Sequence, residues 1–172
     1  LVIFTSDHGY NIGHHGIWHK GNASWILTNR NESQNTSDNT DNIPPNRRPN
    51  LFDTSLKVPA LIRWPAGIPA GSTISRTITH LDWFPTILAA ADISPPQDTL
   101  LRGQSILPLL TGAGDLDRSD DLYLEYSVHH TMRADMRGYR TPEWKLKRDF
   151  LNPGRDELYH LKTDPHETTN LA

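Results

Sequence analysis

Hydrophobic residues along the chain are gathered in short runs, and long polar segments separate them. Two runs show almost no polar alternation, residues 1–5 (LVIFT) and residues 58–64 (VPALIRW), and each leads into a segment rich in turn-forming residues. Continuous apolar runs of this length are typical of strands that are covered on both faces. We therefore expect two buried strands in the first half of the chain.

Two helical segments are expected further along. Residues 80–91 (HLDWFPTILAAA) carry Asp82 as a capping residue and Pro85 in the first turn, where proline removes no helical hydrogen bond. Residues 105–110 (SILPLL) predict a short apolar helix or turn that Gly112 stops. The large aromatic side chains expected in the core are Trp64, Trp83, Phe84 and Trp144.

The pattern changes after an acidic segment, residues 115–121, which we interpret as a linker. The segments WKLKRDF and ELYHLK that follow alternate in part between apolar and charged residues, which favours an antiparallel sheet with one face toward water. We predict an α/β portion over residues 1–115 and a small antiparallel subdomain over residues 116–172. The short runs predicted as strands of this subdomain are residues 122–127, 137–141, 144–150 and 157–161.

Composition excludes several classes of protein. The net charge is −3 and no block of Lys or Arg is present, so nucleic acid and anionic membranes are not expected partners. No apolar run approaches the ~18 residues of a membrane-spanning helix. The 172 residues contain no cysteine, which excludes disulfides and thiolate metal sites without assigning a compartment.

Residues 22–50 are rich in Asn, Ser, Thr and Asp and offer few apolar anchors. This composition cannot bury a core, so a long surface loop is expected. Its sequons at Asn22, Asn31 and Asn35 would matter only in a eukaryotic secretory context. The chain opens inside a predicted buried strand without an initiator Met, and we therefore expect it to be part of a longer protein.

Candidate chemistry is concentrated in residues 1–22, LVIFTSDHGYNIGHHGIWHKGN. Asp7 and His8 follow the first predicted strand, and Gly9 permits the backbone bend that could aim both side chains at one ion. On ligand chemistry alone, a carboxylate and an imidazole suit zinc, manganese or iron better than calcium. A plain turn, with the carboxylate capping backbone amides, is the alternative for an isolated Asp-His-Gly.

Three further histidines and a lysine follow in the same loop. His15 and His19 are four residues apart and could bind zinc on a helix, but the neighbouring glycines argue against a helix. We expect His14, His15 and His19 to pack in the loop. Lys20 closes the loop and is a candidate contact for an anionic substrate.

Taken with four later motifs, this loop resembles the type I sulfatases of the alkaline-phosphatase superfamily. The segment FTSDHGYNIGHHGIWHKGN is similar to the family's S-D-H/N-G loop that ends in a lysine. The later segments that match family landmarks are LFDTSLKVPALIRWPAG, HLDWFPTILAAADI, RGQSILPLLTG and DELYHLKTDPHETTNLA. The resemblance implies a partial alkaline-phosphatase-like mixed sheet with helices, followed by the small antiparallel subdomain.

The resemblance also implies roles for individual residues. Asp7 and His8 match the pair that binds the catalytic divalent ion, usually Ca²⁺ in this family. Lys20 matches the lysine that contacts a sulfate oxygen and the bridging oxygen, where it stabilises charge on the leaving group. His80 is a further candidate for substrate binding. The family nucleophile is a formylglycine hydrate made from Cys or Ser in a C/S-x-P-x-R motif.

The chain departs from the family at that nucleophile. It has no Cys and no Ser followed by x-Pro-x-Arg, so we expect the formylglycine upstream and the 172 residues alone to be inactive. The leading interpretation is a fragment of a sulfatase acting on a sulfated small molecule or glycan in a periplasmic, secreted or lysosomal location. The alternatives are a phosphonate monoester or phosphodiester hydrolase of the same superfamily, and a non-catalytic glycan-binding remnant.

Overall fold

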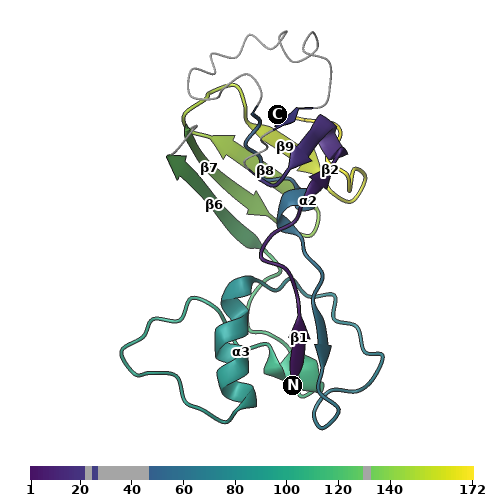
Figure 1. The fold of residues 1–172 in the computed structure, drawn as a ribbon, viewed down its shortest axis with the longest axis vertical. Coiled ribbons are helices and arrows are strands. Elements are labelled where there is room, and N and C mark those ends of the chain that lie inside the picture. The colour runs from purple at the N-terminus through teal and green to yellow at the C-terminus, as the bar shows by residue number, and fades with distance from the viewer. Residues whose placement is uncertain (22–24, 27–46, 130–132) are drawn as a thin grey trace. The chain divides into compact units, whose positions relative to one another are not determined.

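The computed structural model describes residues 1–21, 25–26, 47–129 and 133–172. The three sequons and most of the predicted polar loop lie outside the described residues. The described chain forms two compact units (Figure 1). Unit 1 comprises residues 1–4 and 61–120, and unit 2 comprises residues 5–60 and 121–172. The boundary predicted between residues 115 and 116 stays a prediction for the intact protein.

Unit 1 contains a two-stranded ribbon and three short helical elements. The strands β1 (Val2–Phe4) and β5 (Leu61–Arg63) pair antiparallel. The 3₁₀ helix η2 (His80–Asp82) leads directly into α3 (Trp83–Ala90), and α4 (Leu107–Thr111) follows. The core between them is built on Ile106, Leu110 and Leu116, with Ile62, Ile68, Ile78, Trp83 and Leu109 packed against it.

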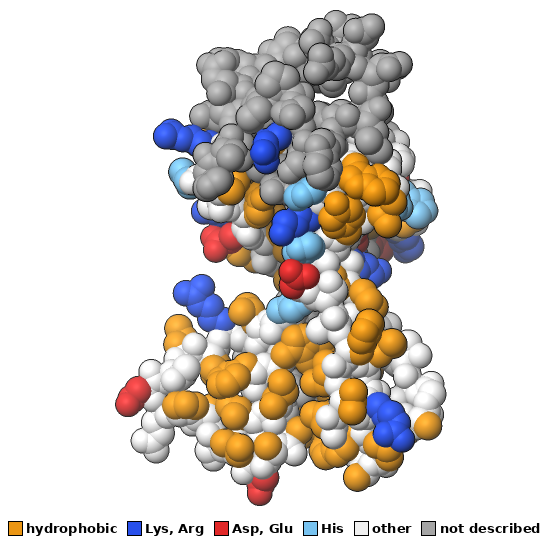
Figure 2. Space-filling view, viewed as in Figure 1, with side chains coloured by type: hydrophobic (Ala, Val, Ile, Leu, Met, Phe, Trp, Pro, Cys, Tyr) orange, Lys and Arg blue, Asp and Glu red, His pale blue; other side chains and the backbone are white. Residues whose placement is uncertain are grey.

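The expectation that the first two strands are covered on both faces is wrong for this chain. Val2, Phe4 and Leu61 are 61 to 63% exposed, because β1 and β5 pair only with each other within the described residues. Phe84 and Trp144, expected in the core, are 51% and 42% exposed. Figure 2 shows hydrophobic side chains spread over the surface of unit 1.

The start of the long helical segment follows the predicted capping. The Asp82 carboxylate accepts a hydrogen bond from the backbone N–H of Thr79 at 2.7 Å, as part of a capping box at the start of η2. It also accepts from the backbone N–H of Gln104 at 2.9 Å, in the segment that precedes α4. The acidic segment is not a free linker as expected. Its Asp115 and Asp120 contact the Arg76 guanidinium at 2.6 Å and 2.7 Å, and this pairing holds the segment against the rest of unit 1.

Unit 2 begins with a small sheet followed by a single helical turn. The strands β2 (Asn11–Ile12), β3 (Ile17–His19) and β4 (Trp25–Ile26) are antiparallel in the order β2-β3-β4. The 3₁₀ turn η1 (His14–Gly16) joins the first two strands. The helix α2 (Asp53–Leu56) is only one turn long.

The second half of unit 2 is the predicted antiparallel sheet. Its strands are β6 (Leu122–His129), β7 (Arg133–Arg140), β8 (Trp144–Asp149) and β9 (Glu157–His160), and they pair in chain order. Each strand is antiparallel to its neighbour, as expected for a chain that returns through short turns. Together with the helices α2, α3 and α4, these sheets confirm the predicted mixed α/β fold class. Within the described residues, no helix is long and apolar enough to cross a bilayer.

In β8 the predicted alternation is present, but its charged side is the covered one. Lys145, Lys147 and Asp149 are 2 to 3% exposed, whereas Trp144 and Leu146 are 42% and 39% exposed. Buried charges are tolerated when they are paired and hydrogen-bonded. The charged side chains of β8 can therefore be buried only because other charged and polar groups pair with them.

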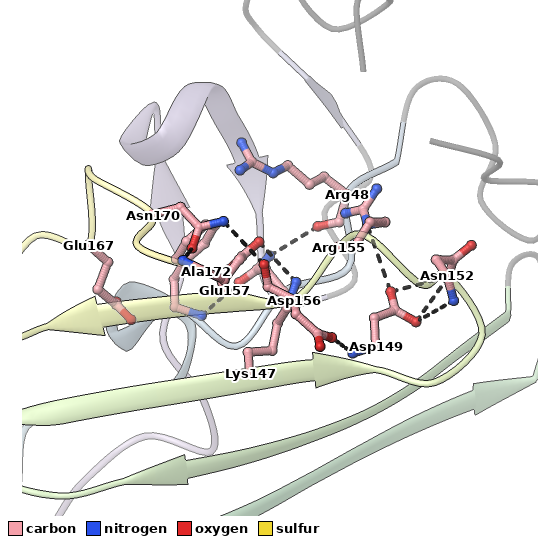
Figure 3. A network of polar contacts seen from close by, with 12 residues as sticks. Arg48, Lys147, Asp149, Asn152, Arg155, Asp156, Glu157, Glu167, Asn170 and Ala172 are labelled. Carbon is pink, nitrogen blue, oxygen red and sulfur yellow. Dashed lines mark hydrogen bonds and ion pairs between the residues drawn. The ribbon is translucent and has the colours of Figure 1, made fainter. Parts of the chain in front are cut away.

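Each buried charge of β8 has such a partner. The Lys145 ammonium contacts Asp53 at 2.8 Å and Glu167 at 2.6 Å, and the Lys147 ammonium contacts the Glu157 carboxylate at 2.9 Å. The Asp149 carboxylate accepts hydrogen bonds from the turn before β9, including the Asn152 backbone and side-chain N–H groups at 3.0 Å (Figure 3). The covered face of the sheet is therefore held by ion pairs as well as by apolar packing.

Candidate active site

Asp7 and His8 turn toward each other directly after β1. The His8 Nε2 atom lies 3.2 Å from Asp7 Oδ2, and the His8 backbone N–H donates to Asp7 Oδ1 at 3.0 Å. The Ser6 hydroxyl donates to the His8 carbonyl at 3.0 Å and thereby closes the bend. The Asp7 side chain is 80% exposed, so its carboxylate is open to a ligand.

The contact with the Gly9 carbonyl fixes the tautomer of the His8 ring. The His8 Nδ1 atom lies 2.9 Å from the Gly9 oxygen. Since a carbonyl only accepts, Nδ1 carries the hydrogen, and in the neutral ring Nε2 is then the acceptor. Metal-ligating histidines are commonly oriented by such a hydrogen bond from the other ring nitrogen.

Two acceptors 3.2 Å apart repel unless a proton or a cation lies between them. Divalent ions hold oxygen and nitrogen ligands at roughly 2.0 to 2.6 Å, so the Asp7 carboxylate and the His8 imidazole fit a shared ion. Among the described residues, however, no group of three or more His, Asp or Glu side chains could hold a metal. The pair alone does not make a metal site, and its role as a pair of metal ligands stays a prediction.

The Asp7 carboxylate is held in its charged form. Desolvation opposes ionisation, but the hydrogen bond from the His8 backbone N–H favours it, and the pKa of Asp7 lies below its usual value. A carboxylate that is ionised at neutral pH is what a divalent ion requires.

Lys20 directly follows β3, in the same unit as Asp7 and His8. Its side chain is exposed and, within the described ranges, makes no hydrogen bond or ion pair. Its proposed contact with an anionic substrate stays a prediction. His80 belongs to unit 1, where it opens η2 as an exposed residue, and its proposed contact with substrate stays a prediction.

The other histidines of the loop do not form a helical zinc pair. His15 lies in η1 and stacks on Phe52, with ring centroids 3.6 Å apart and planes 5° from parallel. Burial, followed by the nearby Arg48 charge, lowers the pKa of His15 to about 4. The imidazole is therefore neutral at physiological pH and packs in the loop, as expected.

Four polar residues behind the loop escaped the sequence analysis. Asn11, Asn50 and Ser55 are 0 to 3% exposed, and Thr54 donates to the Asn11 side chain at 2.6 Å. A short polar side chain in a loop is ordinarily solvated, and nothing local in the sequence marks these as buried. In the sequence, burial of Asn50 is indicated only by its position directly before the apolar residues Leu51 and Phe52, where the polar segment ends.

Known proteins that are similar to this chain indicate its family. Residues 47–172 match the family model described as N-sulphoglucosamine sulphohydrolase, C-terminal. The chain belongs to this sulfatase family. An N-acetylglucosamine-6-O-sulfatase of Bacteroides thetaiotaomicron is 27% identical over 99% of this chain and 26% of that protein. A choline-sulfatase of Rhizobium meliloti is 29% identical over 100% of this chain and 27% of that protein.

Solved sulfatase structures share the fold. One, in complex with its substrate D-glucosamine-2-N,6-O-disulfate, has a TM-score of 0.73 and 26% identity, with 98% of this chain and 29% of that chain covered. A 2-O glycosaminoglycan sulfatase also gives a TM-score of 0.73, at 22% identity over 99% of this chain and 31% of that chain. The sulfatase chain described here thus spans about a quarter of the length of the curated relatives it matches.

Proposed function

We propose that, in the intact protein, this chain supplies one side of a sulfatase active site that hydrolyses sulfate esters of carbohydrates. The observation that carries the proposal is the contact of the Asp7 carboxylate with His8 Nε2, 3.2 Å apart, in a loop that ends at the exposed Lys20. Membership of a sulfatase family supports assigning this loop to sulfate-ester chemistry.

In this proposal Asp7 and His8 hold a divalent ion, and the family resemblance favours Ca²⁺. The carboxylate brings a negative charge, and the hydrogen bond to the Gly9 carbonyl keeps the imidazole oriented. When bound, the ion offsets the negative charge of the sulfate group. The other ligands would come from the rest of the intact protein, since the described residues contribute no set of three.

Lys20 is proposed to contact the sulfate and the bridging oxygen of the ester. When the ester bond breaks, negative charge develops on that oxygen, and a nearby ammonium stabilises it more than it stabilises the ground state. Lys20 can take this role because its side chain is exposed and makes no ion pair with the described residues. The formylglycine nucleophile is proposed to lie in another part of the intact protein, because residues 1–172 contain no Cys and no Ser followed by x-Pro-x-Arg.

The proposed substrate is a sulfated carbohydrate. Support comes from the relatives, since one is an N-acetylglucosamine-6-O-sulfatase and one solved neighbour is bound to D-glucosamine-2-N,6-O-disulfate. His80 is proposed as a further substrate contact in the intact protein.

The test compares sulfate and phosphonate esters with the intact protein. We expect turnover of an aryl sulfate and of a sulfated glucosamine, and much slower turnover of an aryl phosphonate. Lys20→Ala should lower kcat by about 10²- to 10³-fold, in the range seen when one charge-stabilising group is removed. Lys162→Ala, which removes a 70% exposed lysine elsewhere in the chain, is the control and should leave kcat unchanged. Faster turnover of the phosphonate would contradict the proposal.

A further inference from the structure

The backbone carbonyls on both sides of Lys20 are held by buried asparagines. The Asn11 side-chain amide donates to the His19 carbonyl at 3.0 Å. The Gly21 carbonyl accepts from the backbone N–H of Asn50 at 2.9 Å and from its side-chain amide at 3.3 Å. The residue that precedes Lys20 and the residue that follows it are thus each fixed to the protein interior.

One serine joins the two asparagines. The Ser55 hydroxyl accepts from the Asn11 amide at 2.7 Å and donates to the Asn50 side-chain oxygen at 2.8 Å. The Ser55 backbone carbonyl also accepts from the Gly9 N–H at 2.9 Å. Ser55 therefore connects the backbone around Lys20 with the residue that directly follows Asp7 and His8.

The hydrogen bonds leave little freedom in how these side chains are oriented. A carbonyl only accepts, so the His19 oxygen forces the Asn11 NH₂ group toward it. The Asn11 oxygen then faces Thr54, whose hydroxyl donates to it at 2.6 Å. Asn11 is 0% exposed, Asn50 1% and Ser55 3%. Loss of one partner would strand a buried polar group.

We propose that Asn11, Ser55 and Asn50 are positioning residues for Lys20, which act by fixing the backbone from which its side chain extends. The inference rests on the proposed function, because it assigns the three residues a role only if Lys20 contacts the sulfate. The three residues touch no reacting atom themselves. We call them the Lys20 bracket.

Positioning matters here because a lysine side chain is long and flexible. Its four-carbon stem carries a point charge through several rotatable bonds, so the reach of the ammonium depends on where its Cα is held. A displacement of about 1 Å can cost on the order of 100-fold in rate. The buried chain Asn11–Ser55–Asn50 fixes that Cα from two sides without blocking the side chain.

A double-mutant cycle in the intact protein tests the bracket. Ser55→Ala removes the hydroxyl and keeps the carbonyl that binds Gly9. We expect it to lower kcat for an aryl sulfate by about 10- to 100-fold. In a Lys20→Ala background the same change should cause almost no further loss, because the group it positions is already gone. Equal losses in both backgrounds would show a general structural effect and overturn the bracket.

Thr86→Val is the matched control for lost stability. The Thr86 hydroxyl is also buried and also makes two hydrogen bonds, donating to the Asp82 carbonyl and accepting from the Ile106 N–H. It lies in unit 1 and makes neither bond to residues around Lys20. We expect Thr86→Val to lower the melting temperature as much as Ser55→Ala does, with kcat unchanged. A matching fall in kcat would overturn the bracket.

Hydrogen exchange gives a second readout that does not depend on activity. The Asn50 N–H is protected by its bond to the Gly21 carbonyl, and in Ser55→Ala it should exchange faster than in the unmodified protein. Unchanged exchange would overturn the bracket. If Lys20→Ala keeps full activity, the proposed role of Lys20 in catalysis is wrong. If Lys20→Ala lowers kcat and Ser55→Ala lowers it further by the same factor as in the unmodified protein, only the inference about the Lys20 bracket is wrong.

Discussion

The Gly9 N–H donates to the Ser55 carbonyl at 2.9 Å, and this bond joins the Asp7–His8 loop to the helix α2. The two backbone segments approach so closely here that a Cβ atom on residue 9 would overlap the Thr54 carbonyl oxygen. The glycine is thus required by space, since the atom it would meet belongs to backbone and cannot swing aside. The position of the candidate metal ligands therefore depends on α2.

Gly9→Ala should displace the loop from α2. The added methyl group forces the backbone of residue 9 away from Thr54, so Asp7 and His8 lose their relative orientation. We expect Ca²⁺ binding by the intact protein to weaken by at least about 10-fold, in line with losses seen when groups that orient metal ligands are removed. Isothermal titration calorimetry measures this directly.

Gly114→Ala is the control for that change. A Cβ at Gly114 would meet its nearest neighbour, Pro108, at an ordinary contact distance of 3.9 Å. We expect normal Ca²⁺ binding in this variant. Normal binding in Gly9→Ala as well would show that the loop does not depend on α2.

Lys145→Met should destabilise the protein strongly. Lys145 is 2% exposed and its ammonium contacts both Asp53 and Glu167. Removing the shared cation leaves the buried Glu167 carboxylate without its ion-pair partner, while Asp53 keeps only its contact with Arg140 at 3.1 Å. Breaking a buried pair in this way costs about 3 to 5 kcal/mol. Urea unfolding followed by tryptophan fluorescence would show a lower midpoint.

Lys162→Met provides the comparison for a surface pair. The Lys162 ammonium contacts Glu143 at 3.2 Å, but the two side chains are 70% and 54% exposed. Solvent and salt screen such a pair, so its removal should cost about 0 to 1 kcal/mol. Equal midpoints for the Lys145 and Lys162 variants would refute the structural role of the buried cluster.

Asp82 should contribute stability that is lost in acid. Burial opposes ionisation, but the Arg118 guanidinium and the N–H groups of Gln104 and Thr79 outweigh it and hold the pKa of Asp82 below its usual value of about 3.8. The folded state therefore binds a proton less readily than the unfolded state. The stabilisation is full above the unfolded pKa and disappears as pH falls through the folded pKa.

Asp82→Asn removes this titration. The variant should be less stable at pH 7, and its stability should fall less steeply than that of the unmodified protein as pH drops below 4. Melting temperatures measured across this range would show the two curves converging. Parallel curves would mean that Asp82 does not titrate as the geometry requires.

The sequence predicted the elements better than it predicted their surroundings. The four strands of the antiparallel sheet were found because turn residues separate them and alternation extends over several residues. Which face is covered was not predictable, because Lys145 is buried against partners far away in sequence and the partners of Lys147 and Asp149 lie beyond the strand itself. Glu167, for example, lies 22 residues after Lys145, and Asp53 lies 92 residues before it.

The candidate site shows the same division. Asp7, His8 and Lys20 are predicted from chemistry and spacing that resemble a known loop, and their roles stay predictions. Asn11, Asn50 and Ser55 were missed because polar side chains of this size are ordinary in loops, and their burial arises only when α2 packs on the loop. Val2 and Phe4 were expected to be buried, because an apolar run is typical of a strand covered on both faces. The run does not show whether the elements that would cover the strand belong to this chain.

The most direct test of the central claim is Ca²⁺ binding by Asp7→Ala in the intact protein. Calorimetry should show that the replacement abolishes or greatly weakens binding, and turnover of a sulfate ester should fall by at least about 100-fold because a direct metal ligand is lost. Asp98→Ala, at an exposed position in unit 1, should bind and turn over normally. Near-normal Ca²⁺ binding and turnover in Asp7→Ala would contradict the assignment of this loop as the metal-binding part of a sulfatase active site.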